Sequence, residues 1–156
     1  MRIVVHGIPA PQGSKKYMGK RKHGKRAGTA ILAESSEKVK PWRAAVKAEA
    51  EVVIRQWGEW WAPHRGPVLL AVVFTLPAPK SLPKRKPSYP IRMPDLSKLV
   101  RSTEDALTDA GVWEDDARVI ECRSIKTYPK GTMGAHSDAL ESPGAVITVS
   151  PYVGTG

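Results

Sequence analysis

The carboxylates of this 156-residue chain are concentrated in one segment. The chain carries none between Glu59 and Asp95, whereas eight of its fifteen acidic residues lie between positions 95 and 121. These eight are Asp95, Glu104, Asp105, Asp109, Glu114, Asp115, Asp116 and Glu121. Mg²⁺ takes oxygen ligands, often one or two carboxylates completed by water and substrate phosphate. In phosphodiester hydrolysis such an ion stabilises charge on the phosphate oxygens and activates an attacking water. The segment is therefore a candidate for metal-assisted phosphodiester chemistry.

The same residues also have structural interpretations that involve no metal, and the residue types alone favour these over metal binding. Asp95 follows a proline at the head of an apolar-periodic helix, so it suits the N-cap position. Asp115 and Asp116 suit a solvated turn, and Arg101 is spaced either to pair with Asp105 or to reach a scissile phosphate. The acids along the helix are predicted to be surface charges: Glu104, Asp105 and Asp109.

The positive charge gathers in two loops rich in Gly or Pro, at about residues 14–28 and 80–92. With 25 Lys and Arg against 15 Asp and Glu, the formal net charge is +10, which indicates a polyanionic partner. Nucleic acid is favoured over an acidic membrane, because no segment resembles a basic amphipathic helix. The predicted DNA-binding residues are Lys15, Lys16, Lys20, Arg21, Lys22, Lys25, Arg26, Lys84, Arg85 and Lys86.

Several other classes of protein are excluded. Cys122 is the sole cysteine, so an intrachain disulfide is ruled out, and secretory or membrane-spanning segments are absent from the sequence. A cytoplasmic protein that does not enter the membrane is expected. Residues 19–25 have the spacing of a phosphate-binding loop, but Arg26 stands where Ser or Thr is required. The four histidines show no zinc-ligand spacing.

The pattern of apolar residues predicts one α/β (α+β) domain over residues 1–156, with a mixed β-sheet and two main helices. The stretch that follows the first strand, residues 7–28, is predicted to be loop. The third element, at 67–76, is predicted to be a strand buried on both faces. The order is β-α-β-α-β-β, with elements near residues 2–6, 36–58, 67–76, 95–110, 118–128 and 145–149.

The acidic segment also resembles a known family. Residues 94–119 read Pro-Asp-Leu-Ser-Lys-Leu-Val-Arg-Ser-Thr-Glu-Asp-Ala-Leu-Thr-Asp-Ala-Gly-Val-Trp-Glu-Asp-Asp-Ala-Arg-Val. This stretch closely resembles the core motif of the RusA family of Holliday junction resolvases, which are crossover junction endodeoxyribonucleases of bacteria and their phages. The resemblance implies a homodimer that acts on four-way junction DNA with Mg²⁺, or with Mn²⁺ in its place. It also implies a bacterial host cytoplasm and a phage or prophage origin.

The family's catalytic set is an Asp-x-Asp pair, a basic residue further along the helix and an Asp after the Trp turn. By this resemblance the catalytic positions are Asp95, Ser97, Arg101 and Asp116, and Asp95 and Asp116 are the metal ligands. Ser97 stands where the family has the second Asp, and a neutral hydroxyl is a weak Mg²⁺ ligand. Three explanations remain open: a natural impaired copy, deliberate inactivation, or substitution by Asp115.

The expected function is therefore Mg²⁺-dependent resolution of Holliday junctions by paired symmetric nicks, impaired by Ser97. The alternatives are a catalytically silent, structure-selective DNA-binding protein and an RNA-binding accessory protein. A helix from Asp95 to about Asp109 is roughly 20 Å long, and the residues up to Asp116 span at most about 25 Å. A site completed within one chain and a site completed by the partner subunit both remain open.

Overall fold

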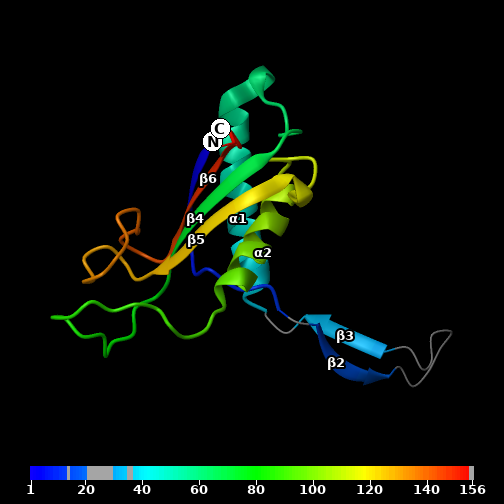
Figure 1. The fold of residues 1–156 in the computed structure, drawn as a ribbon. Coiled ribbons are helices and arrows are strands. Elements are labelled where there is room, and N and C mark those ends of the chain that lie inside the picture. The colour runs from blue at the N-terminus through cyan, green and yellow to red at the C-terminus, as the bar shows by residue number, and fades with distance from the viewer. Residues whose placement is uncertain (14, 21–29, 35–36, 155–156) are drawn as a thin grey trace.

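The computed structural model describes residues 1–13, 15–20, 30–34 and 37–154. Four strands form one mixed sheet in the order β1-β6-β4-β5, and two helices lie on one of its faces (Figure 1). β4 and β5 are parallel, whereas β6 runs antiparallel to both of its neighbours, β1 and β4. The bounds are β1 Arg2–His6, α1 Val39–Trp57, β4 Val68–Thr75, α2 Leu96–Asp109, β5 Val119–Thr127 and β6 Gly144–Pro151. This arrangement confirms the predicted α+β class, the mixed sheet and the order of the main elements.

A two-stranded hairpin adds to the predicted order. β2 (Lys15–Lys20) pairs antiparallel with β3 (Ala30–Glu34), with Lys15 opposite Glu34. The prediction of loop for residues 7–28 is therefore wrong at β2. The Gly and Pro content of the stretch is a local signal, whereas β2 is stabilised by pairing with residues that follow in the chain. The predicted DNA-binding residues Lys15, Lys16 and Lys20 lie on β2, whereas Arg21, Lys22, Lys25 and Arg26 lie outside the described residues.

The core lies between the sheet and the two helices. Trp42 of α1 packs against Phe74 of β4, with ring centroids 6.4 Å apart, and both side chains are buried. β4 alternates between buried and partly exposed residues, because the helices cover one face of the sheet. The prediction that this strand is buried on both faces is therefore wrong. Its regular alternation is the burial pattern of a one-sided sheet.

Helix α2 forms as the periodicity predicts. Leu99, Ala106 and Leu107 are buried against the rest of the core. Two hydroxyl-bearing residues also face inward, and each finds an acceptor: Ser102 Oγ donates to the carbonyl of Ala10 at 2.7 Å, and Thr103 Oγ1 donates to that of Leu99 at 2.9 Å. The opposite side of α2 is left to carry polar side chains. Among the described residues, no helix has both the length and the apolar character needed to cross a membrane.

Candidate active site

The solvent-facing side of α2 carries a polar strip. Ser97, Arg101 and Glu104 stand at positions i, i+4 and i+7, so they share one face of the helix. Ser97 and Arg101 are exposed, whereas Glu104 is half-buried. α2 packs beside the edge strand β5. There, partial burial raises the pKa of the Cys122 thiol, and the negative charge of Glu104 raises it further. The strip thus runs along the edge of the sheet.

The turn after α2 is held by side-chain contacts of the helix itself. Gly111 has a φ of +77°, which favours glycine and lets the chain leave the helix. Trp113 is 2% exposed, and its Nε1 donates to Thr108 Oγ1 at 2.8 Å. His64 closes the turn from outside, since its amide donates to the carbonyl of Val112 and its carbonyl accepts from the amide of Glu114. These contacts fix the backbone immediately before Asp115 and Asp116.

The two aspartates after this turn have different surroundings. Asp115 caps the short 3-10 helix Asp116–Arg118, because its Oδ1 accepts from the backbone amide of Ala117 at 2.8 Å. Asp116 is exposed and lies near Glu104 of α2. Asp115 is thus already engaged as a capping residue, while Asp116 is the aspartate whose charge acts on Glu104 of the helix.

Glu104 is the point at which several of these groups meet. Burial raises the pKa of its carboxyl, the charges of Asp116 and Asp105 raise it further, and the charge of Arg101 opposes the shift. A second carboxylate and a guanidinium therefore both act on Glu104, with opposite effects on its pKa. A cation between Glu104 and Asp116 would relieve their repulsion. Both groups offer hard oxygen donors, so their chemistry fits Mg²⁺ or Mn²⁺ completed by water and phosphate.

The sequence interpretation of Glu104 as a surface charge is incomplete, because its side chain is only partly exposed and lies near Asp116. Its spacing of three residues from Arg101 and seven from Ser97 was the signal that could have identified it. The predicted pairing of Arg101 with Asp105 also differs from the structure. Asp105 Oδ2 instead lies 3.7 Å from Nη1 of Arg43 in α1, and Nη2 of Arg43 lies 2.9 Å from Asp109 Oδ2.

Asp95 stands at the other end of α2. It occupies the N-cap position, as predicted, but its carboxylate caps no backbone amide among the described residues. Its Oδ2 lies instead 3.6 Å from Lys98 Nζ, and the side chain is half exposed. Asp95 precedes Glu104 by nine residues, a rise of about 13 Å along the helix axis. The structure therefore brings Asp116 close to Glu104, whereas Asp95 and Ser97 lie toward the opposite end of the helix.

Within the part of the chain that the structure describes, no group of three or more His, Cys, Asp or Glu side chains is placed to hold a metal ion. Asp95 lies at the start of α2, whereas Glu104 lies in its second half and Asp116 follows the helix. The described part of the chain thus presents one carboxylate pair at Glu104 and Asp116, and a separate carboxylate at Asp95.

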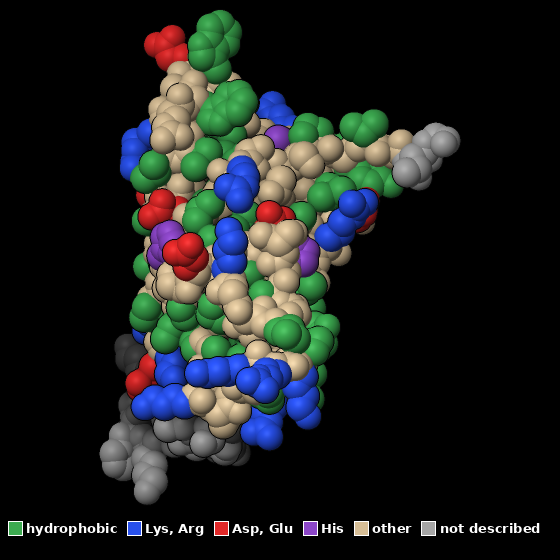
Figure 2. Space-filling view, turned by 90° about the vertical axis from the view of Figure 1, so that its left-hand side faces the viewer, with side chains coloured by type: hydrophobic (Ala, Val, Ile, Leu, Met, Phe, Trp, Pro, Cys, Tyr) green, Lys and Arg blue, Asp and Glu red, His purple; other side chains and the backbone are tan. Residues whose placement is uncertain are grey.

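The predicted basic loop at 80–92 lies beyond the end of the sheet, near the start of α2 (Figure 1). Lys84, Arg85 and Lys86 are exposed there. Figure 2 shows Lys and Arg side chains gathered at the lower end of the molecule, the end at which this loop lies in Figure 1. Cations thus concentrate at the Asp95 end of α2, which suits an anionic partner.

A mixed sheet with two helices on one face, a carboxylate pair beside an arginine and a basic end together define a polyanion-binding protein with the groups for phosphodiester chemistry. The family model Endodeoxyribonuclease RusA matches residues 10–134, and the chain belongs to this family. Membership implies Holliday junction resolvase activity, a hydrolase activity on junction DNA, and nucleases of this family generally depend on a divalent metal. No curated protein matches the chain significantly.

Proposed function

We propose that this chain is a homodimeric endodeoxyribonuclease that resolves Holliday junctions by paired symmetric nicks with Mg²⁺, or with Mn²⁺ in its place. The observation that supports the proposal is that the charges of Asp116 and Arg101 both act on Glu104, in a chain that belongs to the RusA family. A two-fold protein suits a four-way junction, because two symmetric sites can nick two strands of like polarity. Its proposed setting is the cytoplasm of a bacterial host, with a phage or prophage origin.

Within this proposal Asp95 and Asp116 are the metal ligands, and Glu104 supplies a further carboxylate beside Asp116. The bound ion would stabilise charge on the scissile phosphate and lower the pKa of the attacking water. Arg101 is exposed on the same face of α2 as Glu104 and would donate to a phosphate oxygen. Guanidinium groups often make such contacts with two parallel hydrogen bonds. Ser97 adds no negative charge to the site, so we propose that cleavage is impaired while DNA binding is retained.

The position of Asp95 favours a site that two subunits complete together. β5 is an edge strand of the sheet, and its Ile120 and Ile125 are 58% and 40% exposed. An unpaired edge strand is a template for pairing with another chain. Antiparallel pairing of two β5 edges about a two-fold axis would set the two α2 helices antiparallel. Asp95 of one subunit would then lie at the level of Asp116 in the other.

The test of the proposed function is nicking of a synthetic four-way junction in the presence and absence of Mg²⁺. We expect slow, metal-dependent nicks at symmetric positions in two strands, and loss of nicking in Asp116→Asn. Competition by linear duplex and by RNA gives the binding preference. Junction binding without metal-dependent nicking would favour the catalytically silent DNA-binding protein, and preferential competition by RNA would favour the RNA-binding alternative.

A further inference from the structure

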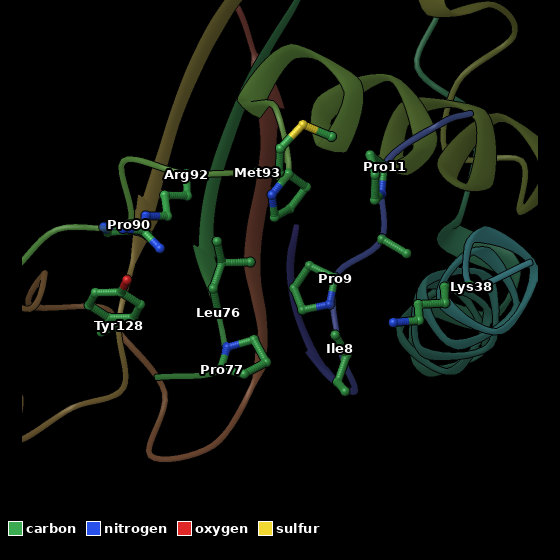
Figure 3. Close-up of a pocket in the computed structure, with 12 residues that line it drawn as sticks. Ile8, Pro9, Pro11, Lys38, Leu76, Pro77, Pro90, Arg92, Met93 and Tyr128 are labelled. Atoms are coloured by element: carbon green, nitrogen blue, oxygen red, sulfur yellow. The ribbon is translucent and has the colours of Figure 1, made fainter. Parts of the chain in front are cut away.

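A hollow lies at the end of the sheet, next to the start of α2. Its volume is about 450 Å³, and five segments between Ile8 and Tyr128 line it. Figure 3 shows Leu76 and Pro9 at its centre, with Arg92 and Tyr128 on one side and Lys38 on the other. Proline and aliphatic side chains make up most of the lining. The hollow is therefore an apolar recess with cations on both sides.

A second hollow of about 600 Å³ adjoins the first, and the two share Pro77, Arg92, Met93 and Tyr128. Between and beside them three apolar side chains face solvent: Tyr89, Ile91 and Met93 are 61%, 90% and 75% exposed. We call these three residues the apolar ridge. Neighbouring exposed apolar side chains at the rim of a groove are typical of an interaction site.

The backbone of the ridge is anchored at several points. Lys126 of β5 donates from Nζ to the carbonyls of Arg92 and Pro94, at 3.0 and 2.9 Å. The amide of Ser88 donates to the carbonyl of Met133 at 3.0 Å, and that of Ile91 to the carbonyl of Tyr89 at 2.9 Å. The ridge is thus presented on a fixed backbone. Such preorganisation lowers the entropic cost of inserting these side chains into a partner.

The charges around the ridge indicate what that partner is. Arg92 and Lys38 line the first hollow, and the adjoining loop carries further exposed cations. The described residues that line the two hollows include no carboxylate. A ligand with flat apolar faces and negative charge fits this surface, which is the chemistry of a nucleotide in a DNA strand. A second copy of the chain fits poorly, since two basic ends of a protein with net charge +10 would repel.

We propose that the apolar ridge inserts at the branch point of junction DNA and that an unstacked nucleotide occupies the adjoining hollows. This inference rests on the proposed function and adds a base-binding site to it. Apolar side chains that enter a base step unstack it, and single bases stack well on aromatic and apolar surfaces. Arg92 and Lys38 would neutralise the phosphates that flank the displaced base.

The site gives a physical reason for junction selectivity. Unpairing costs least where a base already lacks a stacking neighbour or partner, which is the case at a branch point and not within linear duplex. Met93 precedes Asp95 by only two residues. A base held by the ridge would therefore set its neighbouring phosphate close to the Asp95 end of α2.

The test places 2-aminopurine, whose fluorescence rises on unstacking, at the branch point of a synthetic junction. The protein is titrated in EDTA so that no strand is cut, and a linear duplex with the same label is titrated in parallel. The variant is Ile91→Ser with Met93→Ser. Its matched control is Val153→Ser, because Val153 is 86% exposed and lies outside the two hollows.

We expect the native protein to raise the fluorescence of the junction but not that of the duplex. The double variant should lose most of that rise and bind the junction about tenfold more weakly, with duplex affinity kept within about twofold. Val153→Ser should behave as the native protein. An undiminished fluorescence rise in the double variant, or an equal loss of junction and duplex affinity, would overturn the inference.

Sedimentation of the double variant provides a second readout. A dimeric native protein and a monomeric double variant would mean that a second copy covers the ridge, which would also overturn the inference. A native protein that shows no preference for junctions over duplex would instead contradict the proposed function. The failure of the base-binding site and the failure of the proposed function are therefore distinguishable.

Discussion

Glu104 of α2 lies beside Asp116 of the following 3-10 helix, and the pKa of Glu104 is raised by its burial and then by the charge of Asp116. A raised pKa in the folded state means that ionised Glu104 costs stability. The cost is absent below the ordinary pKa of 4.5 and is fully present above the raised folded-state value.

We therefore expect Glu104→Gln to raise Tm at pH 7 in metal-free buffer. The gain should be roughly 1–3 °C, because a half-exposed group in a chain of this size contributes under about 1 kcal/mol. The gain should disappear below about pH 4, where Glu104 is protonated. The exposed Glu141→Gln is the control, and a pH-independent gain in Glu104→Gln would argue against repulsion from Asp116.

The turn that positions Asp116 depends on one hydrogen bond of a buried tryptophan. Thr108→Val removes the acceptor of Trp113 Nε1 and leaves a buried donor unpaired, at a cost of about 1–3 kcal/mol. Chemical denaturation should show this loss, and junction nicking should slow as Asp116 loses its fixed position. Thr148→Val on β6 is the control. Unchanged nicking in Thr108→Val at full folding would mean that this turn does not position the site.

Restoring a carboxylate at position 97 should restore cleavage. Ser97 is exposed in the first turn of α2, so Ser97→Asp costs no packing and gains a few tenths of a kcal/mol from the helix dipole. Single-turnover nicking with Mg²⁺ should rise by about tenfold or more, since each 1.4 kcal/mol or so of added stabilisation gives about tenfold. Ser97→Asp combined with Asp116→Asn is the control. Equal rates for the native protein and Ser97→Asp would show that position 97 does not need a carboxylate.

Mixed dimers test whether the partner subunit contributes Asp95. Asp95→Asn and Asp116→Asn are each expected to be inactive as homodimers. If the two subunits share each site, a heterodimer of the two variants contains one intact site and one doubly altered site. We expect it to nick one strand of the junction at about half the native rate. If each site is complete within one chain, both sites of the heterodimer are damaged and nicking stays absent.

The basic loop should control affinity without affecting chemistry. Replacement of Lys84, Arg85 and Lys86 by Gln should weaken binding to junction and duplex alike and reduce the slope of log affinity against log salt by about 3. The rate of nicking at saturating protein should not change. The control replaces Lys47, Arg55 and Arg65 by Gln, three exposed cations outside that loop. A similar loss of slope in this control would show that the charge acts globally and not through the loop.

Local pattern in the sequence was sufficient to predict the main helices and most of the sheet. The apolar period of α2, its start after Asp95 and its end before Gly111 all follow from signals within a few residues. The segregation of carboxylates and cations, and the motif that identifies the RusA family, are likewise properties of the sequence itself. Burial on one face of β4 was not predictable, because a run of apolar residues does not show how many faces are covered.

Only the tertiary structure decided which of the chemical groups meet. Glu104 lies beside Asp116 because the chain reverses at Gly111 and Trp113, while Asp95 is held apart by the length of α2. The hollow beside the apolar ridge is lined by segments that follow β1, β4 and β5 and by segments that precede both helices. Such sites depend on packing between segments far apart in the chain, and the energies of those contacts leave no periodic signal in the sequence.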